Sequence, residues 1–167
     1  LLRPLLGAAS AELIACIAVP LLLLGGLVAA AFIAARRIAG DAVGLVGVVL
    51  LLTSPSILVQ FAPLRIDHHG WQILLAGVAL MGAFDGRPAR GGVIAALALA
   101  TWLQISSEAL PYTALFAGLF ALRHWIDRAQ APGFIAFAVT LGLAAATLLA
   151  LLRGPGALLA TQCDALS

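Results

Sequence analysis

The chain has 167 residues, of which 63% are hydrophobic and only 10% are charged, whereas soluble domains carry about 25% charged residues. This composition excludes an ordinary soluble domain and indicates an integral membrane protein. All nine basic residues are arginines scattered along the chain, and a net charge of +2 does not indicate a partner that is a nucleic acid.

Apolar stretches of about 20 residues are expected to cross a membrane as helices, because no water is present there to satisfy the backbone. The first such stretch covers residues 8–35, contains Pro20, where we expect a bend, and is followed by Arg36 and Arg37. The second covers residues 42–61 and is interrupted at Pro55, which lacks an N–H and is expected to kink the helix. The third begins at His68 and runs to residue 84.

The second half of the chain contains shorter apolar stretches. Residues 85–91 form a polar connection in which Gly86 and Pro88 break the helix, and we expect its charged side chains to stay in water. Residues 93–105 and 109–122 follow, separated by Ser106-Ser107-Glu108. They could form a spanning hairpin or one re-entrant pair, and we prefer the hairpin. After a polar connection at residues 124–128, the last span covers residues 132–152.

The predicted fold class is therefore all-α, a polytopic transmembrane bundle of about six helices, some of them short or kinked. We expect a single transmembrane domain that is a fragment truncated at both ends, because the chain begins at Leu1 without Met and ends without a charged tail. Cys16 and Cys163 lack the spacing of metal ligands, so we expect two free thiols.

Arginine placement predicts the orientation of the helices, because short cytoplasmic loops are enriched in basic residues. The alternation of spans then places the loop around Asp67 and the turn at Glu108 on the outer face. A re-entrant pair at residues 93–122 would instead leave Glu108 at membrane depth. The arginines expected inside are Arg36, Arg37, Arg87, Arg90, Arg123 and Arg128, and those expected outside are Arg3, Arg65 and Arg153.

One ionisable cluster stands out from the apolar sequence, Arg65-Ile66-Asp67-His68-His69-Gly70-Trp71. A charge near the bilayer centre costs roughly 2.5–3.5 kcal/mol, so such groups usually lie at an interface or cavity and have a function. In an extended loop, residues two apart project to the same face, so Asp67 and His69 can point together while His68 points away. A carboxylate beside an imidazole can bind Mg²⁺ or Mn²⁺, or Zn²⁺ where more imidazole is present.

The same cluster also has a structural interpretation. Asp67 is a good N-cap for a helix that begins at His68, and Trp71 with Arg65 would be ordinary interfacial anchors. Arg65 could instead contact a phosphate oxygen or pair with Asp67. Two protein ligands are too few for a closed metal site, so other groups or a substrate phosphate would have to complete it. Glu108 is either a helix-end carboxylate or a second polar site on the outer face.

The run from Arg65 to His69, followed by an apolar helix, resembles the second acidic motif of oligosaccharyltransferase catalytic subunits. The resemblance is to the Asp-His-His version of archaeal AglB-like proteins, whereas bacterial PglB-like relatives have other polar residues after the Asp. In that family a helix hairpin follows and turns back to the outer face, where Ser106–Tyr112 stands here. The family belongs to the GT-C glycosyltransferases, multi-helix enzymes whose sugar donor is linked to polyprenyl phosphate.

The resemblance implies a glycosyltransferase that moves a sugar or oligosaccharide from that donor on the outer, periplasmic face of a bacterial inner membrane. Asp67 and His69 match the metal-binding Asp and His of the motif, with Mn²⁺ or Mg²⁺ expected and Zn²⁺ left open. Arg65 and His68 would contact the donor phosphate or shape the loop. The catalytic residues are expected upstream, because the family's first acidic motif is missing, and Glu108 lies too close to Asp67 to be its later outer-loop Glu. The fragment alone is not expected to be active, and the acceptor is not specified.

Two other classes of protein remain open. A multi-pass transporter or ion-coupled carrier would use the Asp-His-His cluster and Glu108 as a proton or cation relay. That class predicts polar groups deep within helices and inverted repeats, and the sequence displays neither. A structural subunit would use the loop only to cap a helix, and it predicts that Asp67→Ala leaves function intact.

Overall fold

The computed structural model describes residues 7–65 and 67–158, so Arg3 and Cys163 lie outside the described residues. The chain is 87% helical, with seven α-helices in the described part, and the predicted all-α class is confirmed. The chain divides into two compact units, residues 1–74 and residues 75–167. The boundary falls within α5 (His69–Ala83), and each unit is described by itself.

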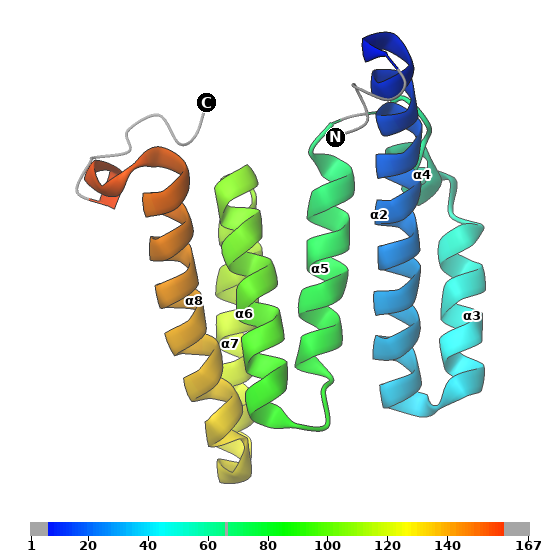
Figure 1. The fold of residues 1–167 in the computed structure, drawn as a ribbon. Helices are drawn as coiled ribbons and strands as arrows, with labels where there is room; N and C mark the ends of the chain where they lie inside the picture. Colours follow the sequence, from blue (N-terminus) through cyan, green and yellow to red (C-terminus); the bar gives the residue numbers. More distant parts are fainter. Residues whose placement is uncertain (1–6, 66, 159–167) are drawn as a thin grey trace. The chain divides into compact units, whose positions relative to one another are not determined.

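In the first unit, α2 (Ala8–Ala39) and α3 (Asp41–Leu52) lie side by side and antiparallel (Figure 1). The turn between them is Gly40, whose φ of 88° lies in the left-handed region that favours glycine. Across this turn, Arg36 Nε lies 3.1 Å from Asp41 Oδ1. Helix α2 continues past residue 35, where we expected its end. Arg36 and Arg37 therefore lie in its last turn. Basic side chains there interact favourably with the C-terminal carbonyls.

The second apolar stretch is broken, as the sequence predicts. Helix α3 ends at Leu52, and α4 (Pro55–Leu58) and the short 3₁₀ helix η1 (Val59–Phe61) continue after a 67° bend. The Thr53 hydroxyl donates to the Val49 carbonyl at 2.8 Å, and Pro55 occupies the first turn of α4, where its missing N–H costs nothing. Phe61 is 2% exposed and packs against Leu23 and Leu27 of α2, forming the core of this unit.

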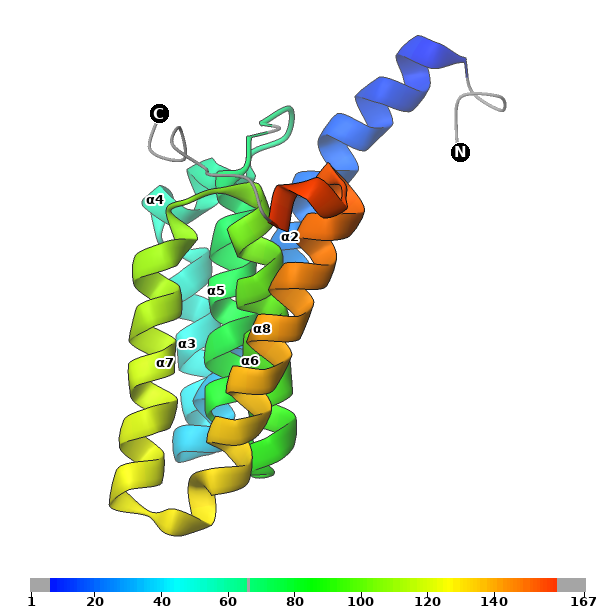
Figure 2. The same ribbon diagram turned by 90° about the vertical axis from the view of Figure 1, so that its left-hand side faces the viewer.

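The second unit contains the rest of α5, α6 (Pro88–Ile105), α7 (Ala109–Ile126), η2 (Arg128–Gln130), α8 (Ala131–Arg153) and η3 (Pro155–Leu158). Helix α8 lies along α6 (Figure 2). A Cβ on Gly92 of α6 would collide with the carbonyl oxygen of Gly133 on α8, so only glycine permits this approach. The core combines alanines of α5 and α6 with rings from α7 and α8, and Phe120 stacks on Phe137 with centroids 4.7 Å apart.

Several predicted boundaries in this unit are wrong. Helix α6 begins at Pro88 rather than at residue 93, because Pro suits the first helical turn. Helix α7 continues to Ile126, so residues 124–126 of the connection expected at residues 124–128 are helical. Helix α5 has only 15 residues.

The expectation that the charged side chains of residues 85–91 stay in water is wrong for Asp85. Its side chain is 1% exposed, and Arg90 donates to both carboxylate oxygens at 3.0 and 3.1 Å. The Arg87 backbone N–H also donates to Oδ1 at 2.9 Å. A buried carboxylate needs such compensation for its lost hydration. The connection is therefore a compact ion-paired turn at the start of α6.

Three described helical segments are long and apolar enough to cross a membrane: α2, α6, and Arg128–Arg153, which joins η2 to α8. The bent segment from α3 to η1 would make a fourth if it is one span. Membrane character is therefore supported, whereas a bundle of about six spans is not confirmed. Helix α6 is among these segments, whereas α7, which also has 18 residues, is not, so the choice between a hairpin and a re-entrant pair stays a prediction.

Candidate functional site

A turn anchored on α2 positions the candidate loop. The Arg65 N–H donates to the Ala62 carbonyl at 3.1 Å, and Leu64 has a φ of 72°, as at the third position of a type II turn, where glycine is usual. Pro63 occupies the second position, which this turn favours in proline. A positive φ costs a leucine free energy, and such strain persists only where the surroundings enforce it.

The contact that holds this turn comes from a gap in the hydrogen bonding of α2. Pro20 has no N–H to donate to the carbonyl of Cys16, four residues earlier. The Leu64 N–H donates to that carbonyl instead, at 3.0 Å. Pro20 thus leaves the Cys16 carbonyl of α2 without a helical donor, and the loop supplies one through the Leu64 N–H. The sequence alone did not identify Leu64 as the donor, although Pro20, four residues after Cys16, was the available signal.

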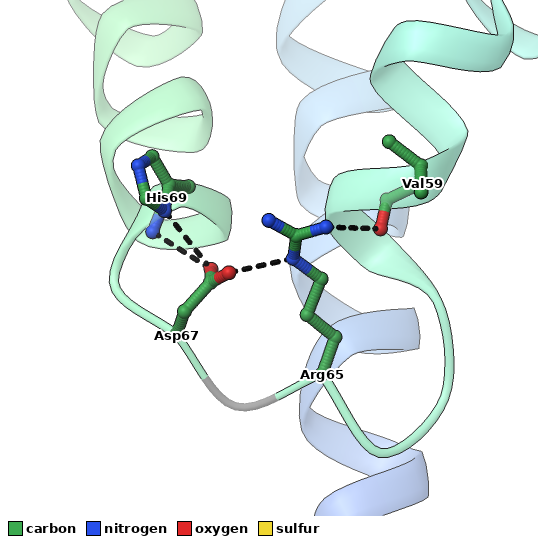
Figure 3. Close-up of polar contacts among 4 residues, drawn as sticks. All are labelled: Val59, Arg65, Asp67 and His69. Carbon is green, nitrogen blue, oxygen red and sulfur yellow. Dashed lines mark hydrogen bonds and ion pairs between the residues drawn. The ribbon is translucent and has the colours of Figure 1, made fainter.

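Asp67 lies between Arg65 and His69 (Figure 3). Arg65 Nε donates to Asp67 Oδ2 at 2.6 Å, which is short even for a charge-assisted bond, and a second guanidinium nitrogen lies 3.4 Å from the Val59 carbonyl. The His69 N–H donates to Asp67 Oδ1 at 3.0 Å, at the start of α5. The side chain of Asp67 therefore supports the first turn of the helix, which begins one residue later than predicted.

These contacts determine the ionisation of Asp67. Burial raises the pKa of its carboxyl and is the largest single influence. The hydrogen bonds from Arg65 and from the His69 backbone, with the electrostatic influence of the same two residues, oppose it and bring the pKa below the ordinary value of 3.8. Asp67 is therefore a carboxylate at neutral pH, as a metal ligand must be.

The two histidines do not separate as predicted. The rings of His68 and His69 stack with centroids 4.5 Å apart, so His68 does not point away from its neighbour. One ring nitrogen of each lies within 4.8 Å of the other. Backbone alternation places the two side chains on opposite faces of an extended strand, but His69 already belongs to α5, and the change from loop to helix brings the rings together.

Asp67 and His69 fit a single cation. Asp67 Oδ1 and His69 Nδ1 lie 3.4 Å apart, and two ligand atoms about 2.1 Å from one ion are roughly 3.0–3.4 Å apart at normal coordination angles. His69 Nδ1 is buried and makes no hydrogen bond of normal geometry within residues 7–65 and 67–158. This buried ring nitrogen needs a partner, and it lies beside a carboxylate. A divalent cation bound to both groups would satisfy it.

Glu108 belongs to the second unit and lies directly before α7. Its N–H lies 3.2 Å from the Ser106 hydroxyl, so it is part of the α6–α7 turn. Nearby, Trp102 is 4% exposed and stacks on Tyr112 with centroids 4.7 Å apart, as packing residues do. Glu108 therefore lies at the start of a helix, and the role of its carboxylate stays a prediction.

Comparisons with protein-family models, with curated proteins and with solved structures found no match.

Proposed function

We propose that this chain is part of an integral-membrane glycosyltransferase that uses a polyprenyl-phosphate-linked sugar donor. In this proposal Asp67 and His69 hold a divalent cation, Mn²⁺ or Mg²⁺, beside the donor phosphate on the outer face of a bacterial inner membrane. The observation that carries it is the 3.4 Å separation of Asp67 Oδ1 and His69 Nδ1, within a strained turn that is anchored on an apolar helix.

The distribution of charge favours this function over an ion-coupled carrier. Ionisable side chains in the described part lie in connections or near helix ends, including Asp41 and Asp85 at turns and Arg153 in the last turn of α8. A proton or cation relay would require such groups along the middle of the spans. A loop that gathers charge at one end of a helix is better suited to a charged headgroup at the membrane surface.

Each residue of the loop would have its own task. The bound cation would act as a Lewis acid that neutralises negative charge on the leaving phosphate. Asp67 stays ionised because of its lowered pKa, and the stacked ring of His68 limits rotation of His69. Arg65 carries a planar guanidinium that suits a phosphate as well as a carboxylate. The groups that activate the acceptor would come from sequence outside this chain.

Binding of Mn²⁺ alone, followed by electron paramagnetic resonance on the full chain in detergent, tests the site without requiring activity. We expect Asp67→Asn and His69→Gln each to weaken binding at least about tenfold, because each removes a ligand. Asp127→Asn is the matched control, since Asp127 also accepts the N–H two residues ahead, from Ala129 at 3.0 Å. Equal Mn²⁺ binding by wild type and both site variants would refute the metal site.

Donor turnover in the full-length protein tests the reaction itself. We expect the polyprenyl-phosphate-linked sugar to be consumed in the presence of Mn²⁺ and not after chelation, with loss of turnover in both site variants. Turnover that is unchanged in Asp67→Asn and His69→Gln would remove these residues from the reaction even if they bind a metal.

A further inference from the structure

One end of the second unit gathers four of the chain's nine arginines. Arg87 and Arg90 lie at the start of α6, and Arg123 and Arg128 lie at the end of α7 and in η2. Arg123 donates to the carbonyl of Ala83 at the end of α5, so the α5–α6 and α7–α8 connections lie at the same end of this unit (Figure 2). With two carboxylates, Asp85 and Asp127, this end has a net charge of +2.

Two of these arginines are occupied inside the unit. Arg90 is held by both oxygens of the buried Asp85. Arg123 is held by the Ala83 carbonyl, and its second terminal nitrogen lies 3.5 Å from Gln130 Oε1. The Arg90 contact ties the start of α6 to the α5–α6 connection, and the Arg123 contact joins α7 to α5, so we assign the two side chains a structural task.

The other two arginines face outward. Arg87 is exposed, and its guanidinium makes no ion pair within the described part of the chain. Arg128 is exposed and contacts only the ring of His124 through one terminal nitrogen, at 3.2 Å, which leaves most of its five donors for another acceptor. The exposed carboxylate nearby, Asp127, accepts instead from Ala129 and Gln130. Within the described part of the chain, the guanidinium groups of Arg87 and Arg128 therefore have more N–H donors than the protein has acceptors for them.

An exposed aromatic residue lies among these arginines. Trp125 and Ile126 are each 74% exposed, at the last residues of α7. Tryptophan prefers the level of the lipid headgroups, with its apolar ring toward the acyl chains. Guanidinium groups beside it then lie at the depth of the lipid phosphates, to which they can donate two parallel hydrogen bonds. The opposite end of the same unit has Glu108 and a single arginine, Arg153.

We propose that this end of the second unit binds the headgroups of anionic phospholipids, with Arg87 and Arg128 as the phosphate-contacting residues and Trp125 as the interfacial anchor. This surface is separate from the candidate metal loop and does not depend on the proposed reaction. Each exposed arginine near an anionic membrane surface is expected to favour anionic lipid about fivefold.

Spin-labelled lipids provide the test, with the full chain reconstituted in phosphatidylcholine vesicles. We expect more immobilised phosphatidylglycerol than phosphatidylcholine at the protein surface, and a smaller preference at high salt because surface charges are then screened. The Arg87→Gln/Arg128→Gln double variant should lose most of this preference, whereas Arg87→Lys/Arg128→Lys should retain part of it. Arg153→Gln, at the other end of the unit, is the matched control and should behave as wild type.

Three outcomes would overturn the proposal. The first is a double glutamine variant that keeps the wild-type lipid preference, and the second is an equal loss in Arg153→Gln. The third is displacement of phosphatidylglycerol by inorganic phosphate beyond the effect of chloride at the same ionic strength, which would indicate a site for a soluble anion. Helical content from circular dichroism should be equal in wild type and both double variants, since both side chains are exposed.

Discussion

At the scale of single residues, Asp67 is the most constrained side chain of the candidate loop. One oxygen accepts from Arg65 and the other from the backbone of His69. Its contact with the His69 backbone was predictable, because Asp67 was expected to cap the start of this helix. The stacking of His68 on His69 was not, because it depends on where the helix begins. Arg65 remains both the partner of Asp67 and a candidate for phosphate contact.

The lowered pKa of Asp67 leads to a prediction about pH. A carboxyl whose pKa is lower in the folded than in the unfolded chain stabilises the fold above the unfolded pKa of about 3.9, and this stabilisation is lost as the pH falls through the folded pKa. We expect the pKa of Asp67, measured by carboxyl ¹³C NMR without metal, to lie below 3.8. Arg65→Gln should raise it, since it removes a hydrogen bond and a positive charge.

Arg153→Gln serves as the control for this titration, because Arg153 is not among the groups that shift the pKa of Asp67, and it should leave that pKa unchanged. The same Arg65→Gln variant should also bind Mn²⁺ more tightly, because a guanidinium no longer competes for the carboxylate. A wild-type pKa at or above 3.8 would contradict the electrostatic description of the loop.

At the scale of helices, α2 is more than a membrane span, because it holds the loop. The carbonyl that Pro20 leaves without an intrahelical donor accepts from Leu64 instead. The sequence predicts a perturbation at Pro20 from local chemistry alone. The partner of the freed carbonyl is more than 40 positions away in the sequence, so only the folded chain could identify it.

Substitution of Pro20 tests this anchor. In Pro20→Ala the new N–H should donate to Cys16 and displace Leu64, so that the Leu64 amide exchanges faster with deuterium. Loss of a hydrogen bond worth about 1 kcal/mol corresponds to roughly fivefold faster exchange. Pro132→Ala, in the first turn of α8, is the control because a proline there replaces no hydrogen bond. Unchanged exchange at Leu64 in Pro20→Ala would show that the turn does not depend on this contact.

At the scale of the whole molecule, the arginine pattern predicts which connections lie on each side of the membrane. Within the second unit, the α5–α6 and α7–α8 connections lie at one end and the α6–α7 turn at the other. We expect Ala89→Cys to be labelled by an impermeant maleimide from the cytoplasmic side and Ser107→Cys from the outer side, in a chain whose Cys16 and Cys163 are replaced.

Right-side-out and inverted vesicles distinguish the possible results. Protection of Ser107→Cys from both sides would support a re-entrant pair and contradict the hairpin. Labelling of both cysteines from one side would contradict the alternation of spans on which the outer-face assignment of Glu108 depends.

The sequence by itself determined the class of molecule, because so few charges and so many apolar residues leave helices in a membrane as the stable arrangement. It also determined the break at Pro55 and the pairing of Asp67 with His69, since both follow from covalent geometry and local spacing. Tertiary structure decided the burial of Asp85 and the acceptor for Leu64. Each of these depends on groups supplied by another helix or by a later turn, and local sequence patterns do not identify such partners.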